Sequence, residues 1–178
     1  MIEYVERLKS LVPPPDGRSG RIDWQEIETR IGNLPGDYKR LVEDYGEGSF
    51  DDFITVLHPS GNEHIDLATV NSEVIWSLRS LEEADEAIPY GIADGQAGIT
   101  PWAVSDNGDL CFWVRDPVDV PASWKVVVKE GRSPIWEYFD GSATEFLYSV
   151  LSGLHRSSIF PQDFPSSGVR FHRSRMTS

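Results

Sequence analysis

The strongest constraint on the fold of this chain is a two-residue turn, Asn107-Gly108, between two stretches of β-forming residues. Both turn residues tolerate positive φ angles, and Asn-Gly is therefore the strongest short-range signal for a β-hairpin. The run before the turn is GITPWAVS, and the run after it is LCFWV, which is apolar at every position. The pattern predicts an antiparallel hairpin whose second strand is covered on both faces.

Two further strands are predicted after this hairpin. The segment WKVVVKE, residues 124–130, alternates, which places Trp124 on one face and Lys125 and Lys129 on the other. The segment IWEYF, residues 135–139, alternates again after a glycine turn. Four β segments in a row, joined by turns, predict an antiparallel meander.

Helical periodicity dominates the beginning of the chain. Residues 1–12 predict a short helix, and Asp23 followed by Glu26 has the pattern of a capping box at the start of a second helix. Pro35 stands where a third helix begins, a position that needs no amide donor. The apolar stripe of this third helix is predicted to enter the core: Tyr38, Leu41, Val42 and Tyr45.

The remaining elements complete the expected fold. Residues 53–57 favour a strand, residues 64–79 a helix, and the acidic, turn-rich residues 81–98 a loop. A last helix is predicted from Ser142, with Leu154 among its inward residues. This order predicts a single α+β domain, in which an antiparallel meander packs against N-terminal helices and a C-terminal helix.

Charge is distributed unevenly over a chain whose net charge is −13. From Glu43 to Asp109 there are fifteen acidic residues and one basic residue, whereas the last 24 residues carry a net charge of +3. An acidic body repels nucleic-acid phosphates and anionic lipids, so we expect neither nucleic acid nor a membrane as partner. It would attract a basic protein, although acidity also serves solubility alone.

Several features favour a cytoplasmic location. No apolar run approaches the roughly 20 residues of a membrane-spanning helix. The first ten residues, MIEYVERLKS, are charged and lack the apolar region of a signal peptide. The single cysteine, Cys111, cannot form an internal disulfide, which agrees with a reducing compartment.

No recognisable catalytic or cofactor-binding pattern is present. The four histidines, at positions 58, 64, 155 and 172, lack the spacing of a metal site. Cys111 lies in a predicted buried strand, and no glycine-rich segment has the lysine of a phosphate-binding loop. We therefore predict no catalytic residue, no metal and no cofactor, while an enzyme with an unrecognised site remains an alternative.

Two groups of carboxylates are the candidate partner-binding residues, since they could oppose the cations of a basic protein. A solvated surface is the alternative interpretation of such runs. Aromatic residues beside them, namely Phe50, Trp76 and Tyr90, could anchor a partner or belong to the core. The predicted partner-binding residues are Glu43, Asp44, Glu47, Asp51, Asp52, Glu82, Glu83, Asp85, Glu86 and Tyr90.

An ordered set of loose motifs resembles the SUKH superfamily, which includes fungal cell-wall regulators of the Smi and Knr type. The motifs are a helix junction with Leu-Pro and Asp-Tyr, a following Tyr-Gly-x-Gly, a tryptophan before an acidic Asn-Gly hairpin, and a C-terminal Phe-Leu helix. The resemblance divides the chain into a helix and linker over residues 1–20, a SUKH-like domain over 21–165, and a basic flexible tail over 166–178. The matching residues are Ile31, Gly32, Leu34, Pro35, Asp37, Tyr38, Tyr45, Gly46, Gly48, Trp102, Asp106, Gly108, Asp109, Phe146 and Leu147.

The resemblance implies a function without catalysis. Bacterial members of the family look like immunity proteins, which bind and block a cognate polymorphic toxin, often a nuclease or deaminase, inside the producing cell. Such a nuclease carries Lys and Arg around its active site, so a basic toxin is the expected partner. A regulatory or scaffolding adaptor with the same fold is the alternative that the fungal relatives imply.

Overall fold

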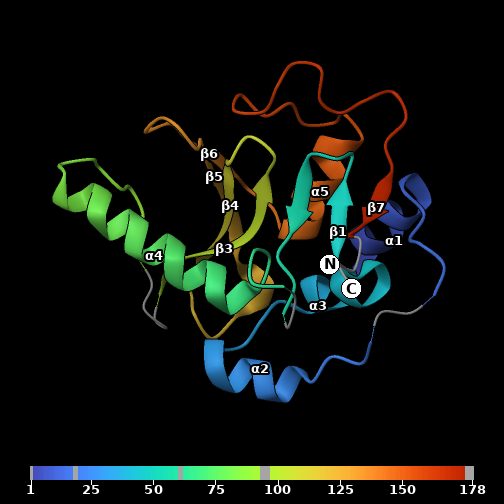
Figure 1. Cartoon of the computed structure of the whole chain (residues 1–178), viewed down its shortest axis with the longest axis horizontal. Helices are drawn as coiled ribbons and strands as arrows, with labels where there is room; N and C mark the ends of the chain where they lie inside the picture. The colour runs from blue at the N-terminus through green and yellow to red at the C-terminus, as the bar shows by residue number, and fades with distance from the viewer. Residues whose placement is uncertain (1, 18–19, 60–61, 93–96, 175–178) are drawn as a thin grey trace.

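One antiparallel sheet organises the molecule, as seen in a computed structural model that describes residues 2–17, 20–59, 62–92 and 97–174 (Figure 1). In these residues the sheet has seven strands in the order β6-β5-β4-β3-β2-β1-β7, and five helices pack around it, which confirms the α+β fold. The helices are α1 (Ile2–Leu11), α2 (Trp24–Ile31), α3 (Gly36–Tyr45), α4 (Leu67–Glu83) and α5 (Ala143–Leu151). The strands are β1 (Gly48–Phe50), β2 (Ile54–Val56), β3 (Gly98–Ser105), β4 (Leu110–Arg115), β5 (Lys125–Lys129), β6 (Trp136–Phe139) and β7 (Phe171–Arg173).

The predicted Asn-Gly hairpin is confirmed as β3 and β4. Gly108 turns the chain with a φ of 85°, and Asp109, which is only 3% exposed, fixes the turn. One Asp109 oxygen accepts a hydrogen bond from Ser105 Oγ at 2.6 Å, and the other accepts one from the Gly131 amide at 3.0 Å. The Asp109 carboxylate therefore stabilises the fold by joining the β3–β4 turn to the β5–β6 turn.

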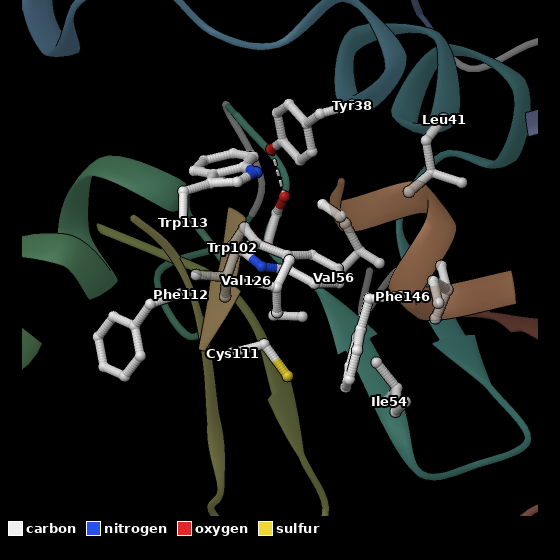
Figure 2. Packing of buried hydrophobic residues seen from close by; sticks show 14 of the residues in the cluster. Tyr38, Leu41, Ile54, Val56, Trp102, Cys111, Phe112, Trp113, Val126 and Phe146 are labelled. Carbon is white, nitrogen blue, oxygen red and sulfur yellow. Dashed lines mark hydrogen bonds between the residues drawn. The ribbon is translucent and has the colours of Figure 1, made fainter. Parts of the chain in front are cut away.

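Helices α1, α3 and α5 pack on one face of the sheet. Tyr38 of α3 meets the ring of Trp113 edge-on at 4.9 Å, and Trp102 lies against Phe146 of α5. Figure 2 shows this cluster, with the Tyr38 hydroxyl donating to the Leu57 carbonyl. The predicted inward residues of α3 are buried here, and the edge-on contacts between the rings add to the stabilisation gained from burying their apolar area.

Helix α4 packs on the opposite face, which is why β4 is covered on both sides. Val74, Leu78 and Leu81 of α4 face Leu110 of β4, which alternation points away from Cys111 and Trp113. The alternation of residues 124–130 placed Lys129 on the same face of the strand as Lys125, and at Lys129 this face is covered by α4 and the segment after it. Lys129 is buried and forms an ion pair with Glu86 at 3.4 Å.

The sheet extends further than the sequence suggested. Asp51 and Asp52 adopt positive φ and turn the chain between β1 and β2, so residues 48–56 form a hairpin instead of one strand. Residues 171–173, which were expected in a flexible tail, form β7 and pair with β1. Residues 175–178 of that tail lie outside the described residues.

The two ends of the domain are held by the helices α1 and α5. Helix α1 lies before the SUKH-like segment in sequence and packs into the core: Val5 and Leu8 are fully buried, and Tyr45 donates a hydrogen bond to the Val12 carbonyl at 2.6 Å. The last helix begins at Ser142 as predicted, and its hydroxyl accepts a hydrogen bond from the Glu145 amide. Leu154 lies beyond the end of this helix and is 75% exposed, so its predicted inward position is wrong.

Candidate functional site

The first acidic segment, residues 43–52, is tied to the rest of the molecule. Asp44 forms ion pairs with Lys9 at 3.3 Å and with Arg40 at 2.9 Å. Glu43 accepts a hydrogen bond from the indole nitrogen of Trp24 at 2.6 Å. These two carboxylates join α3 to α1 and α2.

The other carboxylates of the first acidic segment hold the C-terminal part of the chain. Asp51 accepts hydrogen bonds from the amide and hydroxyl of Ser166, the amide at 2.7 Å. Asp52 lies 2.6 Å from a ring nitrogen of His172, next to the β1–β7 pairing. Glu47 lies 3.9 Å from His58, so every predicted partner-binding carboxylate in this segment has a neighbour inside the chain.

The second acidic segment, residues 82–86, is much more available. The structure extends α4 through Glu83, four residues beyond the predicted end, so Glu82 and Glu83 stand on the last helical turn. Glu82, Glu83 and Asp85 are exposed, and Asp85 turns the chain with a φ of 65°. Only Glu86 of this segment points inward among the described residues, toward Lys129.

An exposed tryptophan lies on the same helix. Trp76 is 73% exposed on the outer side of α4, three residues after Glu73 and seven before Glu83, a spacing that places all three on the same side of the helix. We define the α4 surface as Glu73, Trp76, Arg79, Glu82, Glu83 and Asp85. It combines four carboxylates, one arginine and one large aromatic ring on α4 and the turn that follows it, at one side of the molecule and away from α1 and α3 (Figure 1).

The other two candidate anchors are less available. Phe50 is buried between Tyr45 and Phe171 and belongs to the core. Tyr90 is half-buried and packs its ring against Trp136 at 5.5 Å. Trp76 is therefore the aromatic residue beside the acidic segments that a partner could cover.

The groups with potential reactivity lie in structural positions. Cys111 is fully buried, and burial raises the pKa of its thiol far above the ordinary value, which keeps it protonated. Burial also lowers the pKa of His58. Within the described residues no group of three or more His, Cys, Asp or Glu side chains is placed to hold a metal ion.

The largest of the described hollows lies beside the loop after α5. It measures about 260 Å³ and is lined by apolar side chains and by His155, Arg156 and Ser158. Its polar groups already have partners, since Glu137 of β6 accepts hydrogen bonds from His155 at 2.9 Å and from the Ser158 amide and hydroxyl at 2.6 Å. Burial alone would raise the pKa of Glu137, but these hydrogen bonds hold it below its ordinary value.

Comparison with known proteins adds no relative. No family model, no curated protein and no solved structure matches this chain. In the described part of the chain, every helix is too short or too polar to cross a membrane.

Proposed function

We propose that this protein is a non-catalytic immunity protein that binds a basic toxin through the α4 surface. The observation that carries the proposal is Trp76, a large ring left 73% exposed among the carboxylates of α4. Trp is the residue type most enriched among the few that dominate binding energy at protein interfaces.

The chemistry of the α4 surface suits a basic protein. Covering the ring of Trp76 removes apolar area from water, which favours association. The carboxylates of Glu73, Glu82, Glu83 and Asp85 outnumber Arg79, so the surface attracts a positively charged partner and speeds its encounter. A nuclease must carry cations to bind phosphates, and it is thus a partner of matching charge.

The resemblance to the SUKH superfamily supports the class of function. The motif residues Tyr38, Trp102 and Asp109 are buried, and so the shared motifs describe a scaffold. The α4 surface lies outside those motifs, as expected for a region that differs from one toxin partner to the next.

The direct test is protection of cells. The chain is co-expressed with the toxin encoded by the gene next to its own, and growth is measured. We expect the wild-type protein to restore growth and Trp76→Ala to weaken binding by roughly 2 kcal/mol or more, or about thirtyfold in Kd. Cell death at adequate levels of the wild-type protein would contradict the proposal.

A matched variant controls for the loss of an exposed ring. Tyr138 of β6 is 53% exposed and far from α4 in sequence, so Tyr138→Ala is expected to protect cells like the wild-type protein. Equal loss of protection in both variants would argue against the α4 surface. Binding of a different cellular protein through Trp76, without protection from the toxin, would favour the adaptor.

A further inference from the structure

The hollow beside the loop after α5 has room for much more than water. It measures about 260 Å³, whereas a cavity of about 10–15 Å³ is enough to hold one water molecule. Sites for drug-sized ligands begin at roughly 300 Å³, so this hollow is slightly smaller than such a site. Its size therefore suits a small organic molecule.

Aromatic side chains form apolar walls of this hollow. Phe160 and Phe164 both line it, and their rings meet edge-on with centroids 5.6 Å apart. Both rings also pack against Phe53, which ties the loop to the turn between β1 and β2. Val150 of α5 adds an aliphatic surface. These contacts fix the walls before a ligand arrives, which lowers the entropic cost of binding one.

An arginine borders the hollow without a carboxylate partner. Arg156 lines the hollow, and its Nη1 donates a hydrogen bond to the Gln162 carbonyl at 3.1 Å. Within the described residues this is its only side-chain hydrogen bond, and no Asp or Glu forms an ion pair with it. A guanidinium carries five N–H donors and stays charged in proteins, so most of its donors remain available to an anion.

A histidine supplies a second polar group to the hollow. His155 lines it, and its Nε2 lies 2.9 Å from Glu137 of β6. In the part of the chain that the structure describes, the other ring nitrogen, Nδ1, has no partner. This nitrogen accepts a hydrogen bond when the ring is neutral and donates one when the ring is protonated. His155 can therefore bind a polar group of a ligand in either state.

We propose that the hollow beside the loop after α5 binds a small aromatic carboxylic acid. The ring of the acid would lie against Phe160 and Phe164, because aromatic rings gain from edge-on and offset contacts. Its carboxylate would pair with Arg156, whose planar guanidinium can bind both oxygens at once. The α4 surface contributes no residue to this hollow, so the site does not depend on a toxin partner.

The proposal is tested by NMR on the intact protein, with phenylacetate as the probe. The backbone amide signals of residues 155–164 report binding. We expect phenylacetate to shift these signals in a saturable manner. Phenylacetamide has the same shape without the charge and should bind at least about tenfold more weakly. Acetate has the charge without the ring and, at equal ionic strength, should also bind at least about tenfold more weakly.

Two arginine variants provide the matched comparison. Arg156→Gln removes the cation at an exposed position, and we expect it to weaken phenylacetate binding at least about tenfold. It should also abolish the preference for phenylacetate over phenylacetamide, which a merely structural role of Arg156 would not do. Arg21→Gln makes the same change at an exposed position before α2, at the other side of the molecule (Figure 1), and should leave binding unchanged.

Three outcomes would overturn the proposal, and each can be observed with the wild-type protein alone. The first is a set of loop signals that do not respond to phenylacetate, or that respond without saturation. The second is equal affinity for phenylacetate and phenylacetamide, which would show that the hollow does not select a carboxylate. The third is tighter binding of inorganic phosphate than of phenylacetate at the same signals, which would assign Arg156 to tetrahedral anions.

Discussion

The two acidic segments have similar composition but opposite positions in the fold. Residues 43–52 place their carboxylates against cations and hydrogen-bond donors from α1, α2 and the C-terminal part of the chain. Residues 82–86 end a helix at the side of the molecule, and three of their four carboxylates are exposed. Negative charge in a sequence therefore does not identify a surface that is free to bind.

The two segments differ in how many of their carboxylates contact residues that are distant in sequence. Lys9 and Ser166 reach the first segment from positions 35 and 115 residues away from Asp44 and Asp51. In the second segment one carboxylate, that of Glu86, forms an ion pair with a residue distant in sequence, Lys129. Internal carboxylates should thus contribute to stability, whereas exposed ones should contribute to encounter with a partner.

The largest effect on stability is expected from the internal pair in the second segment. Lys129→Ala leaves Glu86 facing a covered part of the sheet without its cation, and we expect the free energy of unfolding to fall by about 2–3 kcal/mol. Urea denaturation measures the loss. The control is Lys125→Ala on the same strand, whose solvent-exposed ion pair with Asp140 should contribute little to stability. Equal losses of stability in Lys129→Ala and Lys125→Ala would show that the internal ion pair contributes no more than the exposed one.

A carboxylate outside both segments extends the comparison to pH. Because the pKa of Glu137 is lowered in the folded protein, its stabilisation is present above the unfolded pKa and is lost as pH falls through the folded value. Glu137→Gln should therefore lower stability by roughly 1–2 kcal/mol at neutral pH. The gap between wild type and variant should begin to shrink near the ordinary carboxyl pKa of about 4 and should close as the pH falls below the lowered pKa of Glu137. A gap that stays constant in acid would refute this account.

Two aspartates with the same backbone conformation give a sharper comparison. Asp51 and Asp85 have φ angles of 56° and 65°, a region that Asn also tolerates. Asp51→Asn weakens the charge-assisted hydrogen bonds with Ser166 and should cost about 1 kcal/mol in chemical denaturation. Asp85→Asn has no such bond to lose in the described residues and should be nearly neutral. The reverse order of effects would show that the tail does not depend on Asp51.

The smallest stability change is expected for the exposed glutamates. Glu82→Gln combined with Glu83→Gln should alter stability by no more than about 0.5 kcal/mol. Association with a basic partner should slow severalfold at low salt, and this difference should vanish at high salt. Glu43→Gln combined with Asp44→Asn should instead lower stability and leave the association rate unchanged. Stopped-flow kinetics and denaturation distinguish the two pairs.

Local patterns predicted much of the fold. The side chain of Asp23 accepts a hydrogen bond from the Glu26 amide, and the apolar stripe of α3 enters the core, as expected from spacing of three and four residues. The hairpin was predicted from the Asn107-Gly108 pair, of which Gly108 adopts a positive φ and Asn107 does not. The caps, helix faces and turns of these elements are formed by residues that are close in sequence, so their patterns can be recognised in the sequence itself.

The missing parts depend on contacts over long distances in the chain. β7 is short and without alternation, and its strand conformation follows from backbone pairing with β1. Lys129 alternates like an exposed residue, and only the position of α4 makes it internal. Arg115 of β4 is buried against Thr100 of β3 and the ring of Trp124, and no local motif could have indicated these contacts.

The β1–β7 pairing has a consequence for folding order. Gly48 pairs with Arg173, and a Cβ at position 48 would lie 2.2 Å from the His172 carbonyl, so the β1–β7 seam requires a glycine at this position. The two strands of the seam are also separated by most of the chain. Closing so long a loop for three residue pairs is entropically unfavourable, and the seam should form late and open first. Amide hydrogen exchange should therefore be faster in β7 than in β5. Each opening uncovers the edge of β1 beside Phe50, which would make the partly opened molecule the species most prone to aggregate.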